Sequence, residues 1–317
     1  MSVDQEVGRG ATARPLRPAG WRRYLPYFLL AVAIVNFSFF FPVNRLGADH
    51  GFPFFAFVFW YSFGAGIILL GVAAIRRELP PLTRRRLIAY LVSSFLGFAA
   101  PFSLLAFVAT KLPSGISVLL VILTPVFTYL FSLMARTEKL HWMSIGGLVL
   151  GVVGILFVVV PSDSLPEANM VGWALISLLA PACFAALNVF TELFHPPETP
   201  PFALSSGVLL TGALTLLPFM LGTGQLYIFP GPDLDADLAL AAAVVINLLM
   251  WPIFYTLIKL TGAFQFSIMN IVAVVLGFVW SMVFFAEAHS HYVWIAMALM
   301  LLGALLIILR PRRRPAA

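Results

Sequence analysis

The sequence predicts an all-α polytopic membrane protein, with ten transmembrane helices arranged as two inverted five-helix repeats. Three observations lead to this prediction: the composition, the lengths of the apolar runs, and the positions of the basic residues. Of the 317 residues, 61% are hydrophobic and only 10% are charged, and the mean hydropathy is +1.00. In soluble domains about a quarter of the residues are charged. The lipid bilayer must therefore be the solvent for most of this chain.

The apolar residues form continuous runs, each long enough to cross the hydrocarbon core as a helix of about 20 residues. A membrane β-barrel would instead show alternating segments of about ten residues. The predicted spans are 24–43, 53–75, 87–108, 114–135, 142–160, 171–191, 202–221, 238–258, 263–285 and 291–309. The shortest connection lies at Thr261 and Gly262, where the eighth span is expected to end.

Basic residues fall on one side of this predicted topology. Ten helices that begin inside place 17 of the 19 Lys and Arg residues in cytoplasmic loops and tails, and leave only Arg45 and Lys111 outside. The predicted outer loops carry acidic residues instead, namely Asp163, Glu167, Asp233, Asp235 and Asp237. Because Lys and Arg accumulate on the cytoplasmic side of membrane proteins, both termini are predicted to be cytoplasmic. Nine or eleven helices would remove this asymmetry.

The two halves of the chain share a weak repeat with an offset of 149 residues. Glu138 corresponds to Glu287, and both follow a long apolar helix and precede a glycine-containing one. Five helices per repeat is an odd number, so the second copy enters the membrane from the opposite side. Inverted repeats of this kind are typical of secondary transporters.

The segment 114–160 resembles the EamA-type branch of the drug/metabolite transporter superfamily. The matching features are small residues at the start of its first helix, Thr124-Pro125 in mid-helix, Glu138 at the helix end, and a glycine-rich helix that follows. Segments 254–270 and 284–309 repeat this pattern more faintly. The resemblance implies ten helices in two inverted repeats around a central solute pathway. The expected organisation is a disordered cytoplasmic tail (1–23), a first repeat (24–160), an outer linker (161–170), a second repeat (171–309) and a basic cytoplasmic tail (310–317).

Polar side chains within the predicted spans are candidates for contact with a solute. An amide that faces lipid loses its hydrogen bonds at a cost of several kcal/mol, so it must face protein or a wet cavity. Spacings of four residues place an amide, an indole and a phenol on one helix face, and two threonines on another. The predicted solute-binding residues are Asn36, Asn188, Asn247, Trp251, Tyr255, Asn270, Thr124 and Thr128. The alternative for these groups is hydrogen bonding and close packing between helices.

Two prolines and two charged residues are candidates for gating or hinge roles. Pro101 and Pro252 interrupt the third and eighth predicted helices at nearly equivalent positions of the two repeats, as paired hinges would. Glu192 and Lys259 lie at cytoplasmic helix ends, where they can pair. By the predicted spans, none of the thirteen Asp and Glu residues lies in mid-helix. Since a proton relay needs an ionisable group inside the membrane, transport is not expected to be coupled to protons through a buried carboxylate.

The function predicted from these features is secondary transport, with export of a small neutral or zwitterionic metabolite such as an amino acid. A broad-specificity drug efflux protein is one alternative, and a membrane-embedded lipid-modifying enzyme is another. The only acidic cluster that would serve an enzyme is Asp233, Asp235 and Asp237, which is more simply a solvated loop. No catalytic residue, metal site, cofactor or nucleic-acid partner is expected. The expected partners are the solute and the lipid bilayer of the cell membrane, with the protein as a monomer or homodimer.

Overall fold

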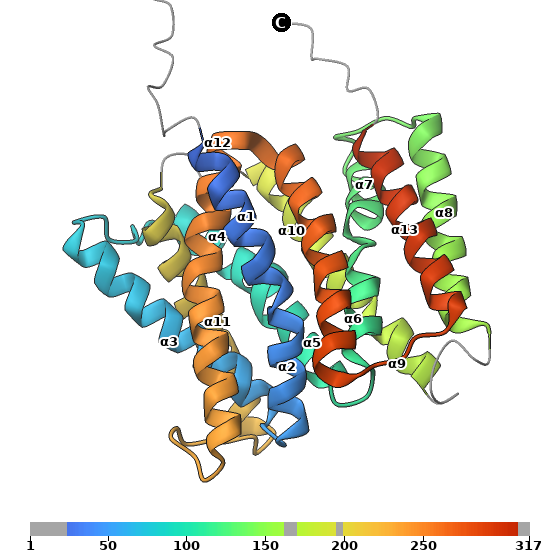
Figure 1. The fold of residues 1–317 in the computed structure, drawn as a ribbon. Helices are drawn as coiled ribbons and strands as arrows, with labels where there is room; N and C mark the ends of the chain where they lie inside the picture. The colour runs from blue at the N-terminus through green and yellow to red at the C-terminus, as the bar shows by residue number, and fades with distance from the viewer. Residues whose placement is uncertain (1–23, 162–169, 195–198, 310–317) are drawn as a thin grey trace, which may run out of the picture.

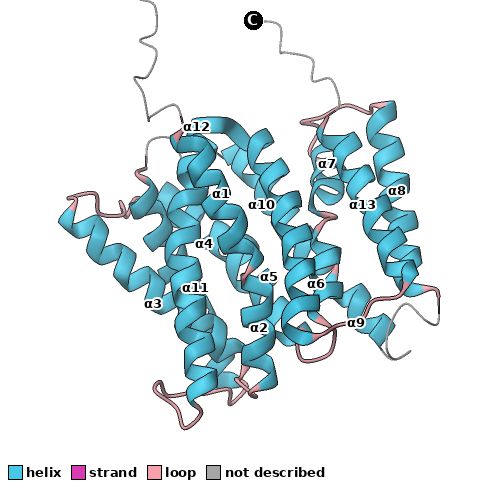
Figure 2. Cartoon of the chain, viewed as in Figure 1, coloured by secondary structure: helices cyan, strands magenta, loops and turns pink. Residues whose placement is uncertain are grey.

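The computed structural model describes residues 24–161, 170–194 and 199–309, without the side chains of Glu192, Ile258, Lys259 and 261–269. Helix is the only regular secondary structure in these residues (Figure 2). The first half comprises α1 (Leu25–Ser38), α2 (Phe40–Asp49), α3 (Phe54–Ile75), α4 (Arg84–Ser94), the π-helix η2 (Phe95–Ala99), α5 (Ala100–Val108), α6 (Ser114–Val121), α7 (Thr124–Met134) and α8 (Trp142–Val159). The second half comprises α9 (Met170–Ser177), α10 (Leu179–Phe194), α11 (Pro201–Gly222), α12 (Leu234–Phe285) and α13 (His291–Ile308).

These elements form the predicted membrane-spanning helices. Within the described residues, nine helical segments are long and apolar enough to cross a membrane, and the shorter apolar segment Asn270–Phe285 completes the set. Several spans consist of two or three consecutive elements, such as α1 with α2 and α4 with η2 and α5. The ten-helix prediction is therefore confirmed, with span ends that differ by a few residues from those predicted.

The predicted break in the backbone helix at Thr261 and Gly262 was wrong. The backbone stays helical through this point, and α12 continues for 52 residues from Leu234 to Phe285. A straight helix of this length would measure about 78 Å, whereas the hydrocarbon core is about 30 Å thick. Figure 1 shows that α12 turns over at one face and returns. At the corresponding connection of the first repeat, Pro113 lacks an N–H group and directly precedes α6. No proline lies between Lys259 and Asn270, so the helix of the second repeat can continue.

Both ends of the helical part lie on one face of the molecule. In Figure 1, α1 begins and α13 ends at the upper face, where α12 also turns over. We call this the terminal face. The connection from α11 to α12 lies at the opposite face, as do the end of α8 and the start of α9. The connection from α11 to α12 and the described ends of α8 and α9 thus share one face, opposite the terminal face.

The contacts between helices are symmetric: they stay the same when each span is replaced by its equivalent in the other repeat. Helix α3 packs against α11, α8 against α13, and α6 against α12, and each pair joins equivalent spans of the two halves. The contact of α1 with α12 has its counterpart in the contacts of α10 with α5 and α7. This pattern is what two inverted five-helix repeats require.

The third and fourth spans are each divided between consecutive elements. A π-helical turn, Phe95–Ala99, separates α4 from α5, and Pro101 lies in the first turn of α5. Residues Ile122 and Leu123 separate α6 from α7, with Pro125 in the first turn of α7. Pro252 was predicted to interrupt its helix, but α12 continues through it without a break. The preceding turns and the neighbouring helices can accommodate a proline in this way.

Candidate functional site

A central cavity lies between the two repeats. Its volume is about 740 Å³, including the part that is open to the surroundings. Elements α1, α2, η2, α5, α6, α7, α10 and α12 contribute side chains to it. The lining residues are Phe37, Phe40, Gly97, Phe102, Val121, Thr124, Phe184, Leu187, Asn188, Ile246, Asn247, Met250, Trp251, Phe254 and Asn270.

An amide and an indole on α12 form one hydrogen-bonded unit in the cavity wall. The Nε1–H of Trp251 donates to Oδ1 of Asn247 at 3.1 Å, and Nδ2 of Asn247 donates to the carbonyl of Ala243 at 2.9 Å. Residues four apart on a helix face the same side, which brings these groups together. The Trp251 ring packs against those of Phe98, Phe254 and Tyr255, with centroids 5.8–5.9 Å away. The orientation of the indole is therefore fixed on both its polar and its apolar side.

A second polar chain crosses from α10 to α7. Nδ2 of Asn188 donates to Oγ1 of Thr128 at 3.2 Å, and Thr128 donates in turn to the carbonyl of Thr124 at 2.8 Å. Thr124 donates to the carbonyl of Val121, just before the interruption between α6 and α7. Asn188 lines the cavity and is also exposed, so the cavity is open at this part of its wall.

The cavity brings together five of the eight predicted solute-binding residues: Thr124, Asn188, Asn247, Trp251 and Asn270. The other three do not line it. Asn36 points to α12 and donates to the carbonyl of Ile246 at 2.9 Å, so its amide joins two helices. Thr128 lies behind Asn188, and Tyr255 packs beside Trp251 without reaching the cavity. The contact of Asn36 matches the alternative of hydrogen bonding between helices.

Sequence reasoning missed most of the cavity's aromatic wall. Five phenylalanines line it, at positions 37, 40, 102, 184 and 254. Their rings are linked across the elements, with Phe40 and Phe102 centroids 4.6 Å apart and Phe102 and Phe184 centroids 5.5 Å apart. The chain has 30 phenylalanines, and an apolar ring has no sequence feature that separates a lipid-facing position from a cavity-facing one.

Of the four predicted gating or hinge residues, two are placed by the structure with their side chains. Pro101 lies next to the π-helical turn whose Gly97 lines the cavity, and Pro252 adjoins Trp251. A Cβ atom at Gly97 would lie 2.4 Å from Cδ2 of Leu187, so a larger residue here would have to displace the Leu187 side chain from the cavity wall. The side chains of Glu192 and Lys259 lie outside the described part of the structure.

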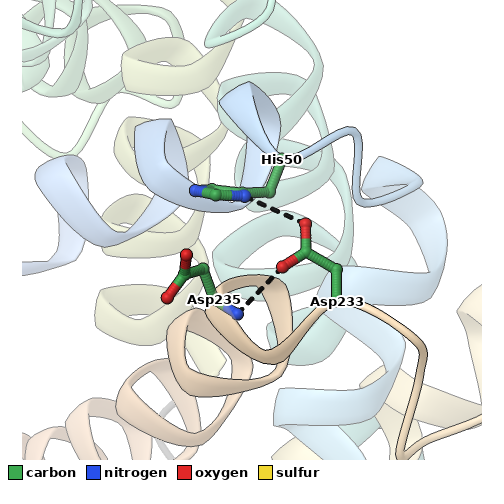
Figure 3. Close-up of side chains that lie close together, drawn as sticks. All are labelled: His50, Asp233 and Asp235. Carbon is green, nitrogen blue, oxygen red and sulfur yellow. Dashed lines mark hydrogen bonds and ion pairs between the residues drawn. The ribbon is translucent and has the colours of Figure 1, made fainter.

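The acidic loop before α12 is organised by its own contacts. Oδ1 of Asp233 accepts hydrogen bonds from the backbone N–H groups of Asp235 and Ala236, which caps α12. Nδ1 of His50, from the end of α2, donates to Oδ2 of Asp233 at 2.9 Å (Figure 3). This hydrogen bond holds the pKa of the Asp233 carboxyl below its ordinary value.

The ligand atoms of His50, Asp233 and Asp235 lie within 4.8 Å of one another, a spacing that a metal ion can bridge. Both carboxylate oxygens of Asp233, however, are already used in the helix cap and the contact with His50. Asp237 accepts from the hydroxyl of Tyr227 and the N–H of Gly231. Asp233 and Asp237 thus hold the loop in place, whereas the sequence suggested only a solvated loop.

Comparisons with known proteins identify the family. A model of the EamA-like transporter family matches residues 24–160 and 171–309, one match for each half. A solved structure described only as "Crystal structure of protein" aligns with a TM-score of 0.57 at 18% identity, covering 89% of this chain and 96% of the other. At this identity the likeness concerns the fold alone. Among proteins with curated descriptions, none matches the sequence.

Proposed function

The chain belongs to the EamA-like transporter family, and from this premise we propose that it exports a small neutral or zwitterionic organic metabolite such as an amino acid. Membership makes it a multi-pass membrane transporter of the drug/metabolite type. Membership in the family does not specify the class of solute, which is our proposal. This proposal rests on the cavity between the repeats, the arrangement by which inverted-repeat transporters hold their solutes near the bilayer midplane.

The lining of the cavity is the observation that carries the proposal. None of the described residues that line it is ionisable. Its polar groups are three amides, one hydroxyl and the indole N–H of Trp251, and six aromatic rings contribute to its lining. Transferring an unpaired charge to such a site is costly, so a solute with a net charge is disfavoured. Amides satisfy the polar atoms of a neutral or zwitterionic solute, and the rings stack on its apolar part.

Counterflow into proteoliposomes tests this function. Liposomes with purified protein are loaded with an unlabelled solute, and uptake of trace labelled solute is followed for neutral amino acids, organic anions and lipophilic organic cations. We expect neutral zwitterions to be taken up above the level of protein-free liposomes. Uptake of organic cations alone would support broad drug efflux, because aromatic faces also attract cations. Uptake of anions alone would contradict the proposal.

A pH gradient across the same liposomes tests the mode of transport. With equal solute on both sides, we expect no net accumulation, because no described cavity residue can take up and release a proton. The solute would then move down its own gradient or by exchange. Uphill accumulation that Glu192→Gln abolishes would contradict this expectation and identify Glu192 as the proton relay.

We also propose that the protein lies in the cell membrane with its terminal face in the cytoplasm. The bias of basic residues toward that face supports this orientation. Single cysteines placed at 165 and 226 in a Cys183→Ser background should react with a membrane-impermeant thiol reagent added to intact cells, while a cysteine at 80 should not. Labelling at 80 with protection at 165 and 226 would reverse the orientation.

A further inference from the structure

A carboxylate from the second repeat binds the start of a helix in the first. Oε1 of Glu287, in the connection from α12 to α13, accepts from the backbone N–H and the hydroxyl of Ser114 at 2.7 and 3.0 Å. Oε2 accepts from the N–H of Gly115 at 2.9 Å. The first N–H groups of a helix have no partner within it, and the helix dipole favours a negative charge there. Glu287 therefore joins the two repeats at the face opposite the termini.

The loop that carries Glu287 is seated tightly on α6. The side chain of His289 is only 4% exposed, and its ring stacks on Phe278 at 4.6 Å. A Cβ atom at Gly115 would lie 2.6 Å from both Nε2 of His289 and Oγ of Ser281, so a larger residue here would have to displace both side chains. Burial lowers the pKa of His289 below its ordinary value, against the opposing effect of the Glu287 carboxylate. Nε2 of His289 lies 3.4 Å from Oε2 of Glu287, and the α6 donors hold the carboxylate in place.

Directly beneath this contact lies a second, smaller cavity, with a volume of about 240 Å³ including its open part. Ser114 and Ser117 of α6 line it together with Asn44 of α2. Oδ1 of Asn44 and Oγ of Ser117 are buried there without a hydrogen-bond partner. Phe40 lines both this cavity and the central one. From the face opposite the termini, the Glu287 contact, the small cavity and Phe40 thus follow one another toward the central cavity.

Within the first repeat, Arg45 fixes the turn that presents Ser114. Its Nη1 donates to the carbonyls of Ala109 and Leu112 at 2.8 and 3.2 Å, and its Nε pairs with the Asp49 carboxylate. The two carbonyls belong to the connection between α5 and α6. The α6 side of the Glu287 contact is thereby rigid, and separation of the repeats at this face requires the carboxylate itself to leave.

We propose that the contact of Glu287 with Ser114 and Gly115, which we call the outer latch, holds the solute pathway closed at the face opposite the termini. The inference rests on the proposed transport function. Opening toward that face exchanges these three hydrogen bonds for contacts with water and admits water to the small cavity and Ser117. Closing restores the hydrogen bonds and seals the cavity above Phe40.

Thiol accessibility below the latch tests this proposal without any solute. The single cysteine, Cys183, is replaced by serine, and Ser117→Cys serves as the reporter. Right-side-out membrane vesicles are treated with a membrane-impermeant thiol reagent, and the labelling rate is measured. Hydrogen bonds to a charged group are among the stronger ones, so we expect Glu287→Gln to raise the labelling rate at least about tenfold, because the open population rises.

Asp237→Asn is the matched control. The Asp237 carboxylate, in the first turn of α12, also accepts two hydrogen bonds at the same face, from Tyr227 and Gly231, but both partners lie in the loop that directly precedes α12 in the same repeat. This variant should leave the labelling rate of the reporter thiol unchanged. An equal increase in both variants would mean a general loosening of the loops and would overturn the proposal.

Two further results would also overturn it. One is an unchanged, slow rate in Glu287→Gln, and the other is rapid labelling of the reporter thiol already in the parent. If Glu287→Gln fails to fold, Glu287→Asp keeps the charge but shortens the side chain by one methylene, and should also speed labelling. Because the assay contains no solute, a negative result leaves the counterflow experiment intact. Absence of counterflow with a functioning latch would instead refute the transport proposal.

Discussion

Replacing Trp251 by alanine should lower solute counterflow at least about tenfold at subsaturating solute, since a loss of about 1.4 kcal/mol in binding is a factor of ten. A stacking contact contributes about 1 kcal/mol beyond the burial of its area. The larger part of the effect comes from the loss of apolar surface, about 2 kcal/mol for a ring of this size. Initial counterflow rates, normalised to the amount of protein in the liposomes, measure this effect.

A conservative variant separates stacking from hydrogen bonding. Trp251→Phe keeps a ring in the wall but removes the N–H donor to Asn247, so it should retain more transport than the alanine variant. Trp142→Ala is the matched control, because that tryptophan is 86% exposed at the start of α8 and away from the cavity. Unchanged transport by Trp251→Ala at normal protein levels would show that Trp251 does not contribute to solute binding.

The second large effect is expected where α8 meets α13. A Cβ atom at Gly303 would lie 2.7 Å from the carbonyl oxygen of Gly147, and one at Gly147 would lie 2.5 Å from the carbonyl oxygen of Gly303. Small residues allow helix backbones to approach closely in membranes, and here each obstacle is backbone that cannot rotate away. We expect Gly303→Val to destabilise the protein by about 3 kcal/mol, the upper part of the range for overpacked sites.

The measurement is the temperature at which the purified protein loses its monodisperse peak in size-exclusion chromatography. Gly71→Val is the control, since a Cβ atom at Gly71 meets nothing within 4 Å. It introduces the same β-branched residue into a transmembrane helix without a clash. Equal stability of the Gly303 and Gly71 variants would show that the two helices can separate without loss.

The fold was largely predictable from the sequence because the relevant signals are one-dimensional. The lengths of the apolar runs located the spans to within a few residues, and the basic residues predicted an even number of crossings. The exception is the turn of α12 near Gly262. A short polar connection looks the same in sequence whether the backbone breaks there or continues as helix.

The site was predicted less completely, for a physical reason. A transmembrane helix is apolar on all sides, so its sequence has no periodicity that reveals which face looks inward. Polar residues were the only available signal, and they serve two purposes: Asn270 lines the cavity, whereas Asn36 joins two helices. The outer latch was overlooked because Glu287, judged by its position at a helix end, looks like an ordinary interfacial charge.

The unbroken course of α12 has a consequence for the energetics of the transport cycle. Asn247 and Trp251 lie in its first half, and Glu287 follows only two residues after its end at Phe285. Because the backbone stays helical through the turn at the terminal face, the solute-binding residues and the latch belong to one continuous element. Thermodynamic reciprocity then applies to the two events. A solute that shifts the latch equilibrium by a given factor must bind the two latch states with affinities that differ by the same factor.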